Sequence, residues 1–299
     1  MTHQPFKEEI YLKRVISLAF AMILCFSTVV FSHAEQAACS VCEGSNINRQ
    51  DYETWAQPVS SYLVPCTDGI MIFSLQPDGE MKAFYYNSDY SFRESVTIPA
   101  ELPIFGGFCE TQDNYFILTG DENREEDPLK EVFRLTKYDK SWNRLSSAGL
   151  FGANTTVPFD AGSARFSKSG KYLIIRTCHE MYKNPEDGLN HQANVTIQLD
   201  TEKMIITDSF TDVMNTNYGY VSHSFNQFVK VDGDSMVALD HGDAFPRSIV
   251  LIKYKTKVSS GKFTPSYYNT CRAVDMFSIA GQLGDNYTNC SVGGFEMSS

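Results

Sequence analysis

The chain beyond residue 34 lacks any long window with the spacing of about 3.6 residues between apolar side chains that an amphipathic helix requires. It also lacks two catalytic signatures: no GxSxG motif, which forms the nucleophile elbow of many hydrolases, and no HExxH zinc motif. These absences exclude a mainly helical fold, and they leave both classes of hydrolase without support from a motif.

Positive charge is scarce as well. The 299 residues contain 25 lysines and arginines against 36 aspartates and glutamates, so the net charge is −11. Because nucleic acids and anionic membranes attract basic surfaces, this balance argues against both as partners.

A secretory signal peptide is expected over residues 1–34. The basic segment Leu12–Arg14 precedes an apolar run over Val15–Phe31, and the small residues of Ser32–Ala34 mark the cleavage point. The apolar run is also long enough for a short membrane span, so an uncleaved anchor is the alternative and the only membrane contact expected. We therefore expect a secreted or cell-surface protein.

The rest of the chain divides into a polar linker over residues 35–57 and one domain over residues 58–299. Cys39 and Cys42 in the linker have CxxC spacing, but no second pair stands nearby, which favours a disulfide within the pair or plain tail cysteines over a redox or metal site. An oxidising compartment makes other disulfides plausible, and the sequence does not assign their pairing. The cysteines after the cleavage point are Cys39, Cys42, Cys66, Cys109, Cys178, Cys271 and Cys290.

An internal repeat organises the domain. An aromatic residue, Tyr90 in YYNSDYSFRESVTI and Trp142 in KYDKSWNRLSSAGL, follows a turn at Asn or Asp and precedes an arginine. A third copy keeps the turn and lacks the aromatic residue. The four copies begin at Tyr85, Lys137, Ile197 and Ile252.

Two further strands precede each copy. A strongly apolar strand after a polar turn recurs, and before it comes a segment rich in small residues that suits a crowded inner strand. This order predicts an all-β fold, a β-propeller of four-stranded blades, with a β-sandwich as the alternative. The apolar strands are Asp68–Leu75, Asp113–Gly120, Ser169–Thr177 and Asp232–Asp240, and the equivalent points of the small-residue segments are Gly107, Gly162, His223 and Gly294.

The last segment, Val292–Ser299 (VGGFEMSS), should begin another first strand. Either it closes the ring or the chain is a piece of a longer propeller. We expect the second, because the linker Phe263–Cys290 before it is long and irregular. Asp121–Glu131 (DENREEDPLKE) should be a solvated hairpin tip, since it lacks the spaced ligands of a calcium loop.

Three segments resemble a group of exported bacterial β-propeller-like proteins of unestablished function: Arg176–Ile197, Gly219–Asp234 and Leu239–Leu251. The resemblance covers roughly Leu102 to Ser299. It implies export and the propeller fold, and it implies no substrate or catalytic residue.

Every histidine beyond residue 34 lies in the third and fourth repeats, beside carboxylates and an arginine. In the blade register His179 and Glu180 should follow the second strand of one repeat, and Asp240 to Asp243 should follow that of the next. We therefore expect these polar ends to meet on one rim. The candidate ligand-binding residues are His179, Glu180, Tyr182, His191, His223, Asp240, His241, Asp243 and Arg247.

Three interpretations of this rim stay open. Histidines and carboxylates suit a zinc-like metal ion, although no close ligand pair is present. A histidine with a carboxylate partner could act as acid and base in a hydrolase or lyase. The same groups could instead brace one blade against the next by hydrogen bonds, as buried polar groups must find partners.

We expect the domain to be a binding module that recognises an extracellular glycan or peptide at this rim, where aromatic residues such as Tyr182 and Phe245 would stack on the ligand. The alternatives are a secreted hydrolase or lyase that uses the same rim, and a structural module for surface assembly. No cofactor is assigned.

Overall fold

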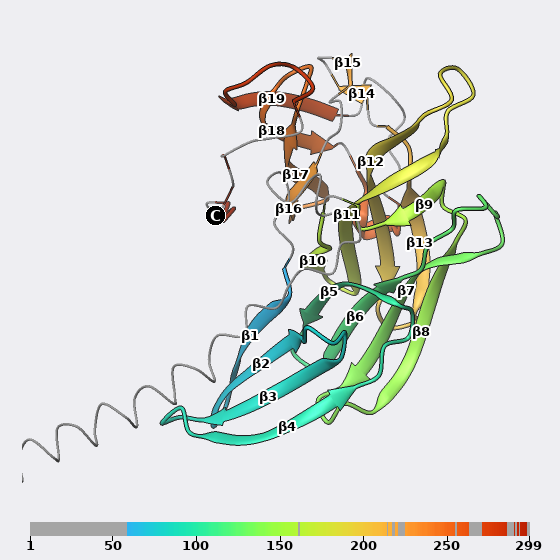
Figure 1. Cartoon of the computed structure of the whole chain (residues 1–299). Coiled ribbons are helices and arrows are strands. Elements are labelled where there is room, and N and C mark those ends of the chain that lie inside the picture. Colours follow the sequence, from blue (N-terminus) through green and yellow to red (C-terminus); the bar gives the residue numbers. More distant parts are fainter. Residues whose placement is uncertain are drawn as a thin grey trace, which may run out of the picture. The chain divides into compact units, whose positions relative to one another are not determined.

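The computed structural model describes residues 59–160, 162–213, 215–216, 219–220, 225–254, 256–262, 271–285, 290, 292 and 294–297. These residues form four large antiparallel β-sheets and one two-stranded pair, and the main path of each large sheet runs through four strands in chain order (Figure 1). This repeated four-stranded meander is the blade of a β-propeller. The expected all-β fold with propeller-type sheets of four strands is confirmed.

The first two sheets follow the predicted repeats closely. The first sheet consists of β1 (Ser61–Cys66), β2 (Gly69–Leu75), β3 (Met81–Asn87) and β4 (Phe92–Ile98). The second consists of β5 (Ile104–Glu110), β6 (Asn114–Gly120), β7 (Glu131–Asp139) and β8 (Arg144–Phe151).

The third and fourth sheets carry additions. The third consists of β10 (Arg165–Ser169), β11 (Tyr172–Lys183), β12 (Asn190–Asp200) and β13 (Ile205–Phe210), with β9 (Thr155–Pro158) paired to β11. The fourth consists of β16 (Phe225–Asp232), β17 (Ser235–Gly242), β18 (Ser248–Tyr254) and β19 (Cys271–Ser278). Between and after them lie β14 (Asn215–Thr216), β15 (Gly219–Tyr220) and the short 3₁₀ helix η1 (Val258–Ser260).

The aromatic residue of the repeat has one conformation in both complete copies. Tyr90 and Trp142 each have a φ of 64°, and each donates its backbone N–H to the turn residue three positions earlier, Asn87 or Asp139. The left-handed backbone closes the hairpin between the third and fourth strands of the blade. In the third sheet Met204 has a φ of 53° in the corresponding hairpin, so the turn is kept where the aromatic residue is lost.

The second strands of the second and third sheets, β6 and β11, are buried because they pack against a neighbouring sheet on either face. In β11, Leu173 and Ile175 join a core cluster with Leu118 and Leu135 of the second sheet, whereas Ile174 points to the other side and joins a cluster of the fourth sheet. Alternate side chains of one strand therefore fill two different inter-sheet cores, which explains the continuous apolar runs in the sequence.

The first strands approach one another closely. Ala164 donates its backbone N–H to the Gly106 carbonyl at 2.8 Å, and a Cβ atom on Gly107 would lie 2.9 Å from the Ala164 Cβ. The small residues predicted for the inner strands are therefore needed where β5 meets the segment before β10.

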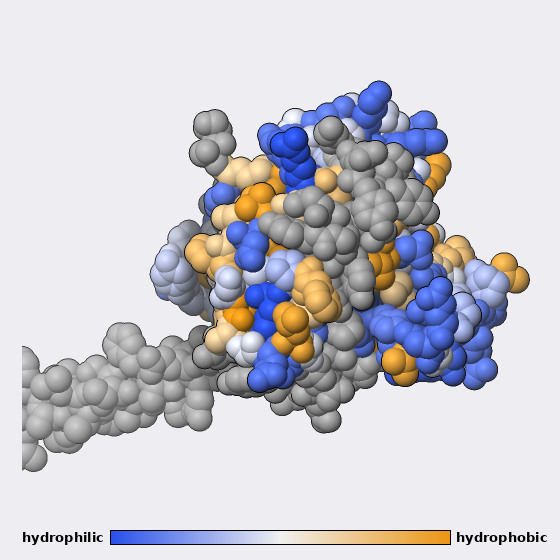
Figure 2. Space-filling view, turned by 90° about the horizontal axis from the view of Figure 1, so that it is seen from above, coloured by the Kyte–Doolittle hydropathy of each residue, from blue (hydrophilic) through white to orange (hydrophobic). Residues whose placement is uncertain are grey.

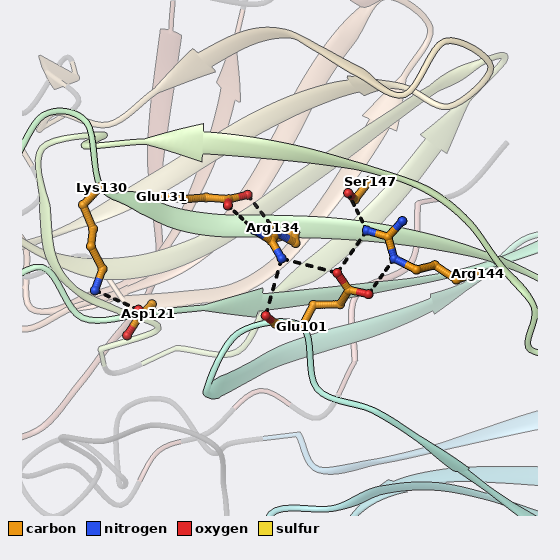
Figure 3. A network of polar contacts seen from close by, with 7 residues as sticks. All are labelled: Glu101, Asp121, Lys130, Glu131, Arg134, Arg144 and Ser147. Atoms are coloured by element: carbon orange, nitrogen blue, oxygen red, sulfur yellow. Dashed lines mark hydrogen bonds and ion pairs between the residues drawn. The ribbon is translucent and has the colours of Figure 1, made fainter.

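A network of charged side chains joins the segment between the first and second sheets to strands of the second sheet (Figure 3). Glu101 precedes β5 and accepts hydrogen bonds from Arg144 at 2.6 and 3.0 Å and from Arg134 at 3.4 Å. Arg134 also pairs with Glu131, and Lys130 pairs with Asp121 at 2.8 Å. The hydrogen bond from Arg144 is the main cause that lowers the pKa of Glu101.

Two expectations about single elements are wrong. The expected irregular linker Phe263–Cys290 contains β19, the outer strand of the fourth sheet. The expected strand after Val292 is not seen, because Val292 and residues 294–297 lie in no strand and the rest of that segment lies outside the described residues.

The expected signal peptide over residues 1–34 and the linker over residues 35–57 lie outside the described residues, so both stay predictions. In the part of the chain that the structure describes, no helix combines the length and the apolar composition needed to cross a bilayer.

Candidate functional site

The expected rim residues of the third sheet lie within strands instead of after them. β11 continues through His179, Glu180 and Tyr182 to Lys183, because β12 supplies a partner along that length and β9 adds a second partner at His179. The expectation that His179 and Glu180 follow the end of the second strand is therefore wrong. The sequence could not show this extension, since the polar residues interrupt the apolar run that marks the strand.

His179 is fully buried. Its ring Nδ1 lies 2.7 Å from the Thr155 hydroxyl of β9, and its Nε2 has no hydrogen-bond partner among the described residues. Burial lowers the pKa of His179 to about 3, and the nearby backbone of Thr211 offsets only a part of this effect. A side chain in this position stays neutral at physiological pH and does not reach solvent.

This burial predicts a pH dependence of stability. An unfolded histidine takes up a proton below pH of about 6.5, whereas His179 in the folded chain stays neutral until about pH 3, so acid favours the unfolded chain between these values. The free energy of unfolding should fall by at most about 1.4 kcal/mol per pH unit from this group below pH 6.5. Urea titrations of the wild type and of His179→Gln at several pH values measure the difference in slope.

The control for that measurement is His191→Gln. His191 is partly exposed and its Nε2 lies 2.8 Å from Asp187 Oδ2 in the hairpin tip between β11 and β12. The His191 variant replaces a histidine that is only partly buried, so its slope should stay closer to that of the wild type than the slope of the His179 variant does. Equal slopes in the His179 variant and the wild type would contradict the burial of a neutral histidine.

Glu180 and Tyr182 hold the loop that follows β6. Glu180 Oε1 accepts hydrogen bonds from the Thr156 hydroxyl at 2.6 Å and from Arg124 at 3.4 Å. The Tyr182 hydroxyl accepts a bond from Asn123 Nδ2 at 2.9 Å and donates to the Asp127 carbonyl at 3.3 Å. Asn123 is only 3% exposed, so the segment expected to be a solvated hairpin tip is docked on β11.

Asp240 forms a buried ion pair across two sheets. Arg176 of β11 donates to Asp240 Oδ2 of β17 at 2.6 Å and to the Thr196 hydroxyl of β12 at 2.9 Å, and Asn194 donates to the same carboxylate oxygen at 3.2 Å. Burial alone would lower the pKa of Arg176, but the Asp240 carboxylate raises it above its ordinary value. Blade-to-blade bracing at Asp240 therefore runs through Arg176, which the sequence analysis did not include among the site residues.

The other residues expected in the fourth sheet are also buried. His241 lies within β17 and is fully buried. Asp243, just after the end of the strand, is also buried. Arg247 donates to the carbonyls of Ala280 at 2.9 Å and Asp285 at 3.1 Å, so it ties the turn before β18 to the segment after β19. These contacts give Arg247 a structural role in the described part of the chain.

The structure thus separates the nine candidate residues. Glu180 and Tyr182 contact the loop of the second sheet, Asp240 contacts the third sheet, and Arg247 contacts the segment after β19. His223 lies outside the described residues. Among the described residues no three His, Cys, Asp or Glu side chains are grouped so that they could hold a metal ion.

The exposed residues of β19 were not expected from the sequence, because this segment was predicted to be an irregular linker. Phe277 in β19 is 67% exposed and Leu283 just after it is also exposed, and neither has a counterpart in the repeat. In the first part of β19 the buried residues Cys271 and Ala273 alternate with exposed ones. This alternation is the one signal that could have revealed a strand.

No protein-family model matches the chain, and no curated protein sequence matches it. Solved structures of propeller proteins do match. A mutant of the Synechocystis apocarotenoid oxygenase is 11% identical with a TM-score of 0.39, and the match covers 71% of this chain and 50% of that chain. The phage phi92 endosialidase is 12% identical with a TM-score of 0.37, and the match covers 59% and 29%.

The WD40 domain of Neurospora crassa Pan2 is 9% identical with a TM-score of 0.37, and the match covers 75% of this chain and 51% of that domain. The chain therefore spans about half the length of the apocarotenoid oxygenase structures and of the WD40 domain that it matches. At these identities the likeness concerns the fold alone. The resemblance to exported bacterial proteins stays a prediction.

Proposed function

We propose that the domain is a binding module that recognises an extracellular glycan through exposed aromatic side chains at one end of the fourth sheet. One contrast supports this proposal most. The polar residues expected to act, among them His179 and His241, are fully buried, whereas Phe245 and Phe277 are 59% and 67% exposed.

The two aromatic residues lie on neighbouring segments. Phe277 is paired with Ile249 at the start of β18, and Phe245 lies in the turn just before that strand. Bonds from the Ile279 N–H to the Arg247 carbonyl and from the Gly284 N–H to the Asp243 carbonyl, both 3.0 Å, join this turn to the segment after β19. The buried Arg247 therefore gives the exposed rings a fixed support, which reduces the entropy lost on binding.

A glycan fits this chemistry better than a broad apolar partner. Aromatic faces stack on the C–H faces of sugar rings, and the exposed Asp275, two residues before Phe277 in β19, offers acceptors for hydroxyl groups. On the face visible in Figure 2, hydrophobic residues lie in separate groups among hydrophilic ones, and they form no single large apolar patch. Recognition by a few stacking contacts suits such a surface more than assembly by a large apolar interface.

The enzymatic alternative has no such support. A hydrolase or lyase that uses His179 or His241 needs one of these side chains to reach its substrate, and both are fully buried. We therefore propose no second function.

Binding of the purified chain to a glycan array and to insoluble polysaccharides tests the proposal. Phe245→Ala and Phe277→Ala should each weaken the affinity for the glycan that binds by about tenfold, the loss expected for one stacking contact of about 1.4 kcal/mol. Phe92→Ala is the matched control, because Phe92 is 57% exposed on β4 of the first sheet. Its affinity should equal that of the wild type.

Two results would count against the proposal. One is binding to a peptide library and to no glycan. The other is glycan binding that both phenylalanine variants keep at full affinity.

A further inference from the structure

Arg165 is an arginine without an anionic partner in the described structure. It lies at the start of β10, is only partly exposed, and its Nε is buried without a hydrogen-bond partner. In the part of the chain that the structure describes, no carboxylate acts on its guanidinium group. A guanidinium group carries five N–H donors and stays protonated at neutral pH.

The other arginines of the described chain show that this state is unusual here. Arg272 is exposed on β19 and can be solvated, and Arg247 donates to backbone carbonyls. Each of the remaining arginines pairs with a carboxylate within 3.4 Å. These are Arg93, Arg124, Arg134, Arg144 and Arg176.

The surroundings of Arg165 are aromatic and uncharged. Its guanidinium carbon lies 4.9 Å from the centroid of the Phe228 ring, a cation–π contact with the fourth sheet. The one ionisable group that acts on Arg165 is the hydroxyl of Tyr62 in β1. Burial raises the pKa of Tyr62 to about 12, so this hydroxyl is neutral at physiological pH. Burial lowers the pKa of Arg165, which reflects the cost of a charge without a carboxylate beside it.

This arginine lies where the first strands of the sheets come together. Two residues before it, Ser163 accepts the Val59 N–H at 2.8 Å, next to β1. Two residues after it, Ser167 accepts the Val231 N–H of β16 at 3.0 Å. Tyr62 also contacts Phe108 of β5, with ring centroids 5.4 Å apart. In a propeller the first strand of each blade lies nearest the central axis, and Arg165 begins the first strand of the third sheet.

We propose that Arg165 anchors a binding site for the oxyanion group of a small ligand, a carboxylate, phosphate or sulfate, with Phe228 and Tyr62 as its aromatic walls. The planar fork of the guanidinium matches the oxygens of such groups in a bidentate contact. A partly buried charge without a counter-ion costs free energy, and a bound oxyanion removes that cost. This site is separate from the aromatic residues of β19 and does not depend on the proposed glycan binding.

Melting temperature and calorimetric titration test the site. Sodium benzoate, inorganic phosphate and sodium sulfate are each compared with sodium chloride at equal ionic strength. At least one of the three should raise the Tm of the wild type in proportion to the logarithm of its concentration. The three salts separate an organic acid from an inorganic ion as the preferred form of the oxyanion.

Arg165→Met should weaken binding of that anion at least tenfold and should melt in chloride at or above the temperature of the wild type, because it removes an unpaired charge. Arg165→Lys keeps the charge without the fork, so it should bind more weakly than the wild type at an equal Tm in chloride. Arg93→Gln is the matched control: Arg93 also lies over an aromatic ring, Tyr85 at 5.1 Å, but it pairs with Glu94.

The control should keep the full anion effect. The proposal is overturned if none of the three salts raises the Tm above that in chloride, or if the rise is equal in the wild type and in Arg165→Met.

Discussion

Replacing Asp240 with Asn should lower the free energy of unfolding by about 3–5 kcal/mol, the range measured when one partner of a buried ion pair is removed. Arg176 would remain buried between the third and fourth sheets with its charge uncompensated, since both side chains are almost completely buried. Urea denaturation at neutral pH measures the effect.

A surface pair of the same length provides the control. Asp232 lies 2.6 Å from Lys253, the distance that also separates Asp240 from Arg176, but the Asp232 side chain is 51% exposed. Asp232→Asn should leave the free energy of unfolding nearly unchanged, because water solvates both charges. Equal losses in the two variants would show that the buried pair does not brace the sheets.

A double variant separates bracing from the penalty of a lone charge. Arg176→Met combined with Asp240→Leu removes both charges, and it should recover most of the stability that Asp240→Asn loses. If the double variant is as unstable as the single one, the loss comes from altered packing of the strands and not from the charge left behind.

Replacing Trp142 with Ala should also cost about 3 kcal/mol, the lower end of the range for a large aromatic side chain in a core, because Trp142 is only partly buried. The indole stacks on Tyr115 with centroids 4.4 Å apart, contacts Phe73 of the first sheet at 5.7 Å, and donates from Nε1 to the Tyr85 hydroxyl at 2.8 Å. One side chain thus joins the cores of two sheets. Thermal and urea unfolding measure the loss.

Tyr90→Ala is the matched control for Trp142, because the two residues occupy the same hairpin position with the same φ of 64°. Any strain of a non-glycine residue at positive φ is therefore common to both variants. Tyr90 is 75% exposed, so its replacement should cost far less. A Tyr90 variant as unstable as the Trp142 variant would place the effect in the turn and not in the aromatic packing.

The fold was predictable from the sequence because its signals are local. Alternation of apolar side chains, the turn at Asn87 and Asp139 and the small residues near Gly107 each depend on neighbours in the chain. β19 was missed because it mixes exposed hydrophobic and charged residues and does not continue the repeat.

The candidate site was less predictable because burial depends on contacts distant in sequence. Asp240 and Arg176 are 64 positions apart, and no periodic pattern links them. His179 and Asp240 were expected from the sequence to follow apolar strands, whereas both lie within strands. Whether such residues face solvent or another sheet is decided by the packing of the blades, which the order of strands alone does not specify.

The meander order of each sheet bears on how the chain can fold. Every main-path ladder joins strands that follow one another in the sequence, so each sheet can form from one short, continuous stretch of chain. Other bonds, such as the one from Val59 to Ser163 over 104 positions, close long loops. The loop-closure entropy is thus spread over many short steps, and the long-range bonds fasten sheets that already hold their own ladders.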